Sequence, residues 1–280
     1  GVSKERKGKP IIQMGLLLDQ SALPITYKLF RGNTNDSCTL LPVLSDLKRE
    51  YNLKRAIVVA DKGLNTGDNK AYNIMKGDGY IFSRSLRGTK ADKEVKAYAL
   101  DEQGYTWLND EYMIKSRIYP TNIWVTNKDG NKVQVEINEK HIFFYSEKYA
   151  RRTKHKRDEL IAKATELISS PSKYARAENY GALKYINGMK VDKKTGELTL
   201  EKKNSIPMLD EKLIREEEKF DGYYSIVTSE LNMPDGKVIE TYQGLWKIEE
   251  SFKITKTMLK TRPIYLKIDD HIEAHFLTCF

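Results

Sequence analysis

The sequence predicts a mixed α/β fold in which a β-rich segment lies between two α/β pieces. Near both ends of the chain, short β-branched and apolar runs have the length of buried strands, and stretches with helical spacing accompany them. The middle instead carries β-branched and aromatic segments, hairpin turn signals and one basic helix. The predicted division is 1–83 for the first piece, 84–219 for the β-rich segment and 220–280 for the last piece.

The first piece opens with two strand patterns separated by a turn, which predict a β-hairpin. The run AIVVADKG, residues 56–63, predicts a buried strand that carries the carboxylate of Asp61 at its carboxyl-terminal end. In chain order, the elements predicted here are strands over 10–18 and 25–30, a helix over 39–51, the strand before Asp61, a helix over 69–76 and a strand over 80–83.

The β-rich segment contains two hairpin turn signals, Asp129-Gly130 and the KKTGE stretch at 193–197. Between them, residues 147–168 predict a long basic helix. The last piece returns to a core pattern, with a buried strand predicted over Tyr223–Thr228 and an amphipathic helix over 242–260.

Composition limits the partners and the metal chemistry. The 280 residues carry a formal net charge of +9, and nucleic acid is the commonest polyanion that such an excess attracts. A merely soluble, lysine-rich surface is the alternative. The two cysteines, Cys38 and Cys279, lie far apart and predict neither a disulfide framework nor a zinc site. With four histidines in the chain, carboxylates are the expected ligands of any metal ion.

The sequence has no apolar run of the ~18 residues that a membrane span needs, and no signal-peptide pattern. We therefore expect a soluble, cytosolic protein without a membrane partner. The chain begins without Met and stops within an apolar run, and we expect it to be a fragment of a longer protein.

The basic helix and two tryptophans each allow two interpretations. The cluster on the helix could contact the phosphate backbone of DNA, or it could be a solvated helix face. Trp107 and Trp124 are expected in the core, with base stacking as the alternative. The basic cluster consists of Arg151, Arg152, Lys154, Lys156 and Arg157.

The predicted helix over 242–260 carries Tyr242, Glu249 and Lys256 at intervals of seven residues. Seven residues return to within about 20° of the same direction, so these side chains form one column beside the apolar face. A carboxylate flanked by a hydroxyl and a cation suits the floor of a cleft. The alternative is a set of boundary residues whose polar ends reach water.

The spacing Tyr242-x2-Leu245-x3-Glu249-x6-Lys256 resembles the Tyr-Arg-Glu-Lys signature of bacterial insertion-sequence transposases of the DDE type. The stretch VVADKGLNT, residues 58–66, is similar to the second-Asp motif of that family. The GNTND and FDGYY stretches resemble further landmarks in family order, so the resemblance covers nearly the whole chain.

This resemblance implies a ribonuclease H-like mixed sheet flanked by helices and interrupted by a β-rich insertion between the second and third catalytic carboxylates. It implies metal-dependent DNA strand cleavage and strand transfer at insertion-sequence ends. By carry-over, Asp61 and Glu249 are the catalytic residues and ligands of two Mg²⁺ (or Mn²⁺) ions, which favour oxygen ligands. Tyr242 and Lys256 would contact DNA phosphate near the scissile bond.

Two departures from the family pattern change what we expect. The signature Arg is Leu245 here, so either this branch lacks that phosphate contact or Lys247 or Lys253 supplies it. The first catalytic Asp of the family falls before residue 1. We therefore expect this piece to hold two of three metal ligands, and by itself to bind metal weakly and to cleave DNA poorly or not at all.

The partners implied are double-stranded DNA, both transposon ends and target, and a second copy of the chain in a homodimer. The implied location is the bacterial cytoplasm, in association with the nucleoid. One alternative is a truncated or inactive transposase remnant that binds DNA without catalysis. Another is an unrelated basic α/β protein with a coincidental helix pattern.

Overall fold

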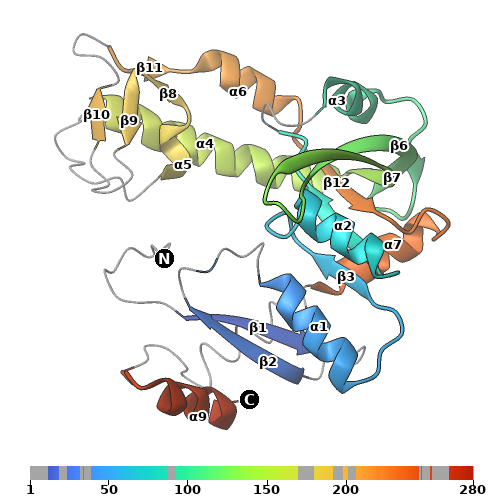
Figure 1. Cartoon of the computed structure of the whole chain (residues 1–280). Helices are drawn as coiled ribbons and strands as arrows, with labels where there is room; N and C mark the ends of the chain where they lie inside the picture. The colour runs from blue at the N-terminus through green and yellow to red at the C-terminus, as the bar shows by residue number, and fades with distance from the viewer. Residues whose placement is uncertain are drawn as a thin grey trace. The chain divides into compact units, whose positions relative to one another are not determined.

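The computed structural model of the 280-residue chain describes residues 12–18, 24–31, 34, 39–87, 92–169, 180–191, 198–200, 206–245, 247, 253 and 265–279. Figure 1 shows its helices and strands. The strands are β1 Ile12–Leu18, β2 Pro24–Arg31, β3 Ile57–Ala60, β4 Gly79–Arg84, β5 Thr106–Trp107, β6 Met113–Thr126, β7 Lys132–Tyr145, β8 Ile186–Asn187, β9 Met189–Val191, β10 Leu198–Leu200, β11 Met208–Leu209 and β12 Tyr223–Thr228. The helices are α1 Leu40–Glu50, α2 Gly67–Met75, α3 Lys93–Leu100, α4 Glu147–Ser169, α5 Tyr180–Leu183, α6 Glu211–Glu218, α7 Asp235–Gln243 and α9 Asp269–Cys279.

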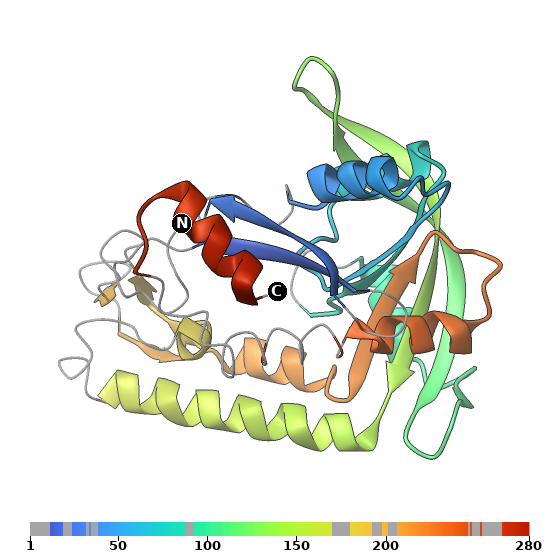
Figure 2. The ribbon, with the colours of Figure 1, turned by 90° about the horizontal axis from the view of Figure 1, so that it is seen from below.

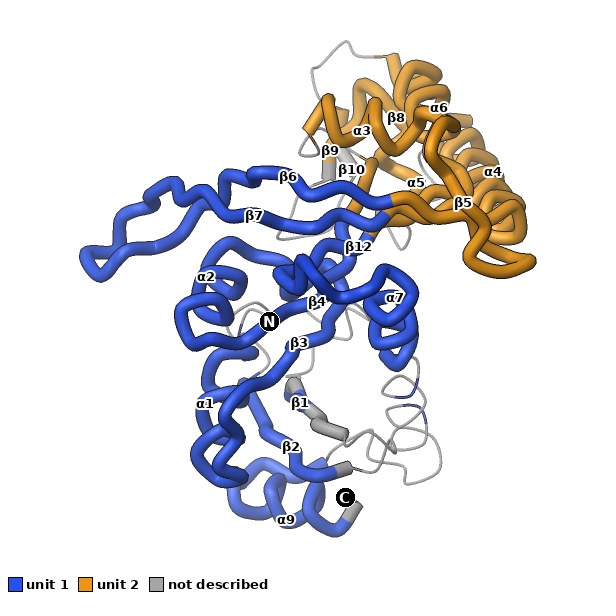
Figure 3. Tube along the Cα trace, turned by 90° about the vertical axis from the view of Figure 1, so that its right-hand side faces the viewer, with its two compact units in different colours: residues 1–84, 116–142, 226–280 blue, residues 85–115, 143–225 orange. Residues whose placement is uncertain are grey.

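Six strands form a mixed sheet in the order β3-β4-β12-β7-β6-β5. Strands β3 and β4 are parallel, with Ile57 opposite Gly79 and Ala60 opposite Phe82. Strands β5 and β6 are antiparallel. The described part of the chain divides into two compact units (Figure 3): unit 1 comprises 1–84, 116–142 and 226–280, and unit 2 comprises 85–115 and 143–225.

The core of unit 1 is built where β3, β4 and β12 meet. Ala60, Tyr80, Phe82 and Val227 form a buried cluster. Tyr80 and Phe82 are two residues apart on β4, so their side chains lie on the same face of the strand, where the rings stack with centroids 4.9 Å apart. Helix α2 packs against β4, and α7 packs against β3 and β4. The sheet is therefore covered by helices in this unit.

The predicted N-terminal hairpin is confirmed as an antiparallel pair of its own, β1 with β2. Ile12 lies opposite Arg31, and the register shifts between Leu17 and Leu18. This two-stranded sheet is separate from the six-stranded one among the residues that the structure describes.

Unit 2 is organised around α4, which runs as one continuous helix (Figure 2). One face of α4 packs on a buried cluster that includes Ala164, Leu167, Tyr185 and Ile186. Where the chain enters β12, Gly222 has a φ of +83°, and a Cβ there would lie 2.8–2.9 Å from Tyr145, Ala150 and the carbonyl oxygen of Ser146. Glycine therefore permits both the turn conformation and the close packing.

Most of the predicted elements are confirmed within one to three residues, including α1, β3, α4 and β12. The Asp129-Gly130 turn joins β6 to β7, with Gly130 at a φ of +81°. Strands β9 and β10 flank the second predicted turn, whose residues 193–197 lie outside the described residues. The boundaries proposed for the β-rich insertion, 84 and 219, remain a prediction.

Two expectations need correction or stay open. Trp107 and Trp124 do not belong to the core, because their exposed fractions are 68% and 59%. The helix predicted over 242–260 falls mostly outside the described residues; the structure ends α7 at Gln243, with Gly244 as its C-cap. Tyr242 therefore lies in the last turn of a helix that begins at Asp235.

In the parts of the chain that the structure describes, no helix is long and apolar enough to cross a membrane.

Candidate active site

Asp61 stands at the carboxyl end of β3, where the sequence predicted it. Its side chain is exposed. The backbone N–H of Gly63 donates a 2.8 Å hydrogen bond to Asp61 Oδ1. The other carboxylate oxygen, Oδ2, has no hydrogen-bond partner among the described residues. Asp61 thus presents one fixed and one available oxygen at the edge of the sheet where α/β proteins usually bind ligands.

The loop that carries Asp61, residues 61–66, is fixed to its neighbours by two asparagines. Asn69, 1% exposed in the first turn of α2, donates from Nδ2 to the carbonyl oxygen of Leu64 at 2.9 Å. Asn65 donates from Nδ2 to the carbonyl oxygen of Ser83 at the end of β4, also at 2.9 Å. Thr66 caps α2 by accepting from the N–H of Asn69. The position of Asp61 therefore depends on α2 and on β4.

A buried ion cluster joins α2, β4 and β7 within unit 1. Glu139 on β7 is fully buried, and its Oε1 accepts from Lys70 Nζ at 2.6 Å and from the Tyr80 hydroxyl at 2.7 Å. His141 Nε2 lies 3.1 Å from Glu139 Oε2. The guanidinium of Arg84 lies 3.3 Å from His141 Nε2 and 3.9 Å from Glu139 Oε2.

The environment of this cluster keeps Glu139 ionised. Burial alone would raise the pKa of Glu139, but the hydrogen bond from His141 and the charge of Lys70 outweigh it and lower the pKa to about 2. Burial lowers the pKa of His141 below its usual value. Both oxygens of Glu139 already have partners in the protein, so this carboxylate is a structural ion and is unsuited to hold a metal.

The other predicted residues near the catalytic column are only partly described. Tyr242 is half-buried in the last turn of α7, and Lys253 is exposed. Leu245, which stands in place of the signature Arg, is helical and half-buried. Glu249 and Lys256 lie outside the described residues. Whether Glu249 shares a cleft with Asp61 stays a prediction.

The basic cluster on α4 separates into two kinds of arginine. Arg151 and Arg152 are exposed, and Arg151 makes one long ion pair, 3.7 Å, with Glu147. Arg157 is only 4% exposed and donates to Asp221 Oδ1 at 2.5 Å. Arg157 therefore belongs to the interior of unit 2 and is not available to DNA. The signal that could have revealed this is its helical spacing with the buried Ala164 and Leu167.

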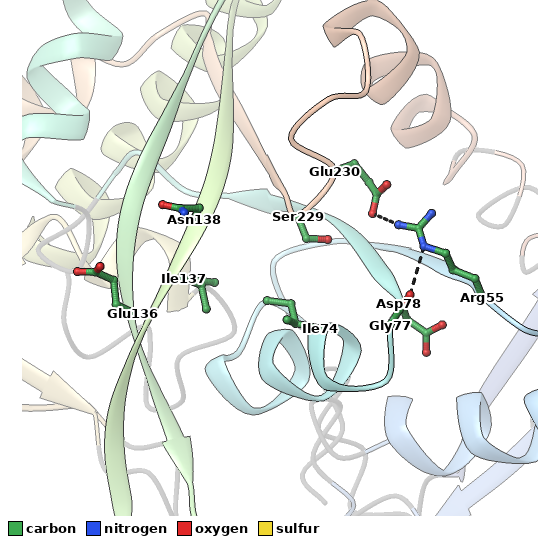
Figure 4. Close-up of a pocket in the computed structure, with 9 residues that line it drawn as sticks. All are labelled: Arg55, Ile74, Gly77, Asp78, Glu136, Ile137, Asn138, Ser229 and Glu230. Carbon is green, nitrogen blue, oxygen red and sulfur yellow. Dashed lines mark hydrogen bonds and ion pairs between the residues drawn. The ribbon is translucent and has the colours of Figure 1, made fainter.

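A pocket of about 430 Å³ lies in unit 1, but not at Asp61 (Figure 4). Its wall includes Arg55 and Asp78, which precede β3 and β4, whereas Asp61 follows β3. Arg55 bridges the wall by donating to Glu230 Oε1 at 2.5 Å and to the carbonyl oxygen of Gly77 at 3.2 Å. The pocket thus lies at the amino ends of the parallel strands, and an internal ion pair spans part of it.

Metal binding requires more than Asp61. The available Oδ2 of Asp61 is the hard oxygen donor that Mg²⁺ prefers. In the described ranges, no three His, Cys, Asp or Glu side chains are grouped so that they could hold a metal ion. Asp61 is therefore chemically suited to be one ligand of a carboxylate metal site, and it is not grouped with two further such side chains in the described ranges.

The family of the chain follows from its whole length. Residues 2–280 match the family model of the transposase DDE domain. No curated protein matches the chain. The chain therefore belongs to the transposase DDE domain family, whose members are DNA-binding, DNA-cleaving enzymes of transposition and recombination that generally use divalent metal ions.

Proposed function

We propose that this chain is the catalytic domain, on a ribonuclease H-like core, of an enzyme for metal-dependent DNA strand cleavage and strand transfer at insertion-sequence ends. The observation that supports the proposal most directly is the position of Asp61. It is exposed at the carboxyl end of β3, with a free carboxylate oxygen and a loop fixed by Asn65 and Asn69. Asp61 and Glu249 are the proposed metal ligands.

The chain's own residues bind and orient the DNA. When bound, a pair of Mg²⁺ or Mn²⁺ ions would supply a nucleophile at neutral pH and neutralise charge on the scissile phosphate. Tyr242, Lys253 and Lys256 are proposed to contact phosphates near that bond. Arg151 and Arg152, exposed on α4, are also proposed to bind the DNA backbone.

The domain boundaries, the oligomeric state and the location are proposed from the resemblance to insertion-sequence transposases. Residues 84–219 form the insertion between the core segments 1–83 and 220–280. The active assembly is a homodimer that pairs two DNA ends, and it works on DNA in the bacterial cytoplasm, at the nucleoid.

Nicking of a supercoiled plasmid by the purified protein tests this function, with Mg²⁺ or Mn²⁺ present. Asp61→Asn keeps the acceptor for Gly63 N–H but removes the charge that holds a metal. We expect nicking to fall by about 100-fold or more, since such ions contribute several kcal/mol to the transition state. Glu249→Gln should do the same, and DNA binding should persist in both variants.

The matched control is Asp110→Asn, which changes an exposed carboxylate in a loop of unit 2. It should nick like the unaltered protein. Nicking by Asp61→Asn at the unaltered rate would overturn the catalytic assignment. Tight binding without nicking by any form would favour the remnant that only binds DNA.

A further inference from the structure

The first turn of α2 connects two parts of unit 1 that lie about fifty residues apart in the sequence. One part is the Asp61 loop, residues 61–66. The other is a β-ribbon, which we define as residues 116–142 of β6, the turn and β7. Figure 3 shows the two strands of the ribbon side by side. Three successive residues of α2, Asp68, Asn69 and Lys70, make the connections.

Asp68 holds the distal end of the ribbon. Its Oδ1 accepts from the backbone N–H of Thr126 at 2.5 Å, and its Oδ2 accepts from the Thr126 hydroxyl at 3.0 Å. Lys132 Nζ donates to the same Oδ2 at 2.9 Å and also lies 2.5 Å from the Thr126 hydroxyl oxygen. One carboxylate therefore joins the last residue of β6 and the first residue of β7 to the helix.

Close packing accompanies this contact. A Cβ at Gly67 would overlap the backbone of Trp124, so the first residue of α2 lies directly against β6. At this point the backbone of the ribbon at Trp124 lies against the backbone of the helix at Gly67. A shift of the ribbon end therefore displaces the start of α2.

The next two residues extend the connection inward. Asn69 holds the Asp61 loop through the carbonyl oxygen of Leu64, and Lys70 pairs with the buried Glu139 of the ribbon at 2.6 Å. The start of α2 is thus fixed to the ribbon at two points, one partly exposed and one buried. Between these two points it holds the loop that carries Asp61.

We propose that this turn of α2 couples the ribbon to Asp61, and that Asp68 is a positioning residue for the DNA-cleaving reaction. The proposal rests on the proposed role of Asp61 as a metal ligand. Asp68 keeps the ribbon end, the helix start and the loop in one geometry. Misplacement of a catalytic group by about 1 Å can slow the reaction about 100-fold, so a supporting contact of this kind affects the rate more than it affects DNA binding.

The ion pair between Asp68 and Lys132 can be broken by changing either residue. A variant of Lys132 leaves the sequence of α2 unchanged, so it distinguishes a positioning role from a loss of helix stability. Asp68→Asn changes the helix, whereas Lys132→Met changes only the ribbon. Lys128→Met is the matched control, because Lys128 is exposed in the turn of the same ribbon and has no ion-pair partner among the described residues. Like Lys132→Met, Lys128→Met removes one positive charge from the ribbon, but it leaves the contact of Asp68 intact.

Hydrogen exchange of the loop amides is the first readout. The N–H groups of Leu64, Asn65 and Thr66 donate to backbone oxygens within the loop. Asp68→Asn and Lys132→Met should each speed their exchange about 10-fold, and the double variant should add little more, because both changes break the same contact. Lys128→Met should leave these rates unchanged.

Plasmid nicking with Mn²⁺ is the second readout. Asp68→Asn and Lys132→Met should lower kcat about 10-fold with little change in KM, whereas Lys128→Met should leave kcat unchanged. Unaltered loop exchange and kcat in both variants would overturn the coupling. If Asp61→Asn nicks normally, the proposed function fails, but the exchange measurement still decides whether the ribbon and the loop are coupled.

Discussion

Two groups of charged side chains lie in opposite environments in this protein. In unit 1, Glu139 is fully buried and bonded to Lys70, Tyr80 and His141. On α4 in unit 2, the side chain of Arg151 is 77% exposed and makes one long ion pair. In the first group each charge holds elements of the fold together. In the second the charges face solvent, where a polyanion can reach them.

The comparison shows that the charged side chains counted in the net charge of +9 have two different roles. Some form buried ion pairs and others face solvent, and the composition does not show which residues do which. A buried ion must have a partner, because its desolvation costs several kcal/mol. An exposed one costs little and contributes little to stability. Arg157 shows that both uses occur on one helix, because it is buried against Asp221 while Arg152 is exposed.

The largest expected effect comes from removing the charge at the centre of the buried cluster. Glu139→Gln leaves the nearly buried Lys70 without its counter-ion, and we expect a loss of about 3–5 kcal/mol of unfolding free energy. Urea denaturation measures it. The double variant Glu139→Gln/Lys70→Met should recover much of that loss. Glu136→Gln, at an exposed position of the same strand, should change stability by less than about 0.5 kcal/mol.

The next effect is a loss of stability in acid. The folded-state pKa of Glu139 is about 2, below its usual value of 4.5. Its stabilisation is therefore complete above about pH 4.5 and is lost as the pH falls towards 2, a change of roughly 3 kcal/mol. The lowered pKa of His141 adds an earlier loss that begins below pH 6.5, because the unfolded chain takes up that proton first.

Unfolding free energies measured between pH 7 and pH 2 follow this change. In Glu139→Gln, the part of the loss between pH 4.5 and 2 should shrink by the contribution of that one group. If the unfolding free energy of the variant falls as steeply between pH 4.5 and 2 as that of the unaltered protein, other carboxylates cause the loss of stability in acid.

The smallest effect compares two arginines of one helix. Arg157→Gln breaks a buried charged hydrogen bond to Asp221, and we expect a loss of about 2 kcal/mol of unfolding free energy. Arg152→Gln should change stability by less than about 0.5 kcal/mol, but it should reduce the slope of log DNA affinity against log salt by about 0.9. Equal stability losses, or an unchanged salt slope, would erase the distinction between the two.

Local sequence patterns predicted much of the fold. Short-range signals predict the hairpin of β1 and β2, the strand β3 that ends just before Asp61, the turn at Asp129-Gly130, α4 and β12. Periodicity and turn residues act within about ten positions, so a sequence can display them directly. The role of Asp61 was predicted from a motif of the same local kind, and it remains a proposal.

The tertiary structure alone decided which charges and aromatic side chains are buried. Lys70 and Glu139 are 69 positions apart, and Asp68 and Lys132 are 64 apart, yet each pair forms an ion pair. No local pattern marks them, because the contacts exist only after α2 lies against the ribbon. Trp107 and Trp124 were expected in the core and are exposed. Their local sequence does not show this either. Burial depends on what the rest of the chain places over a residue, and that is settled when distant segments pack.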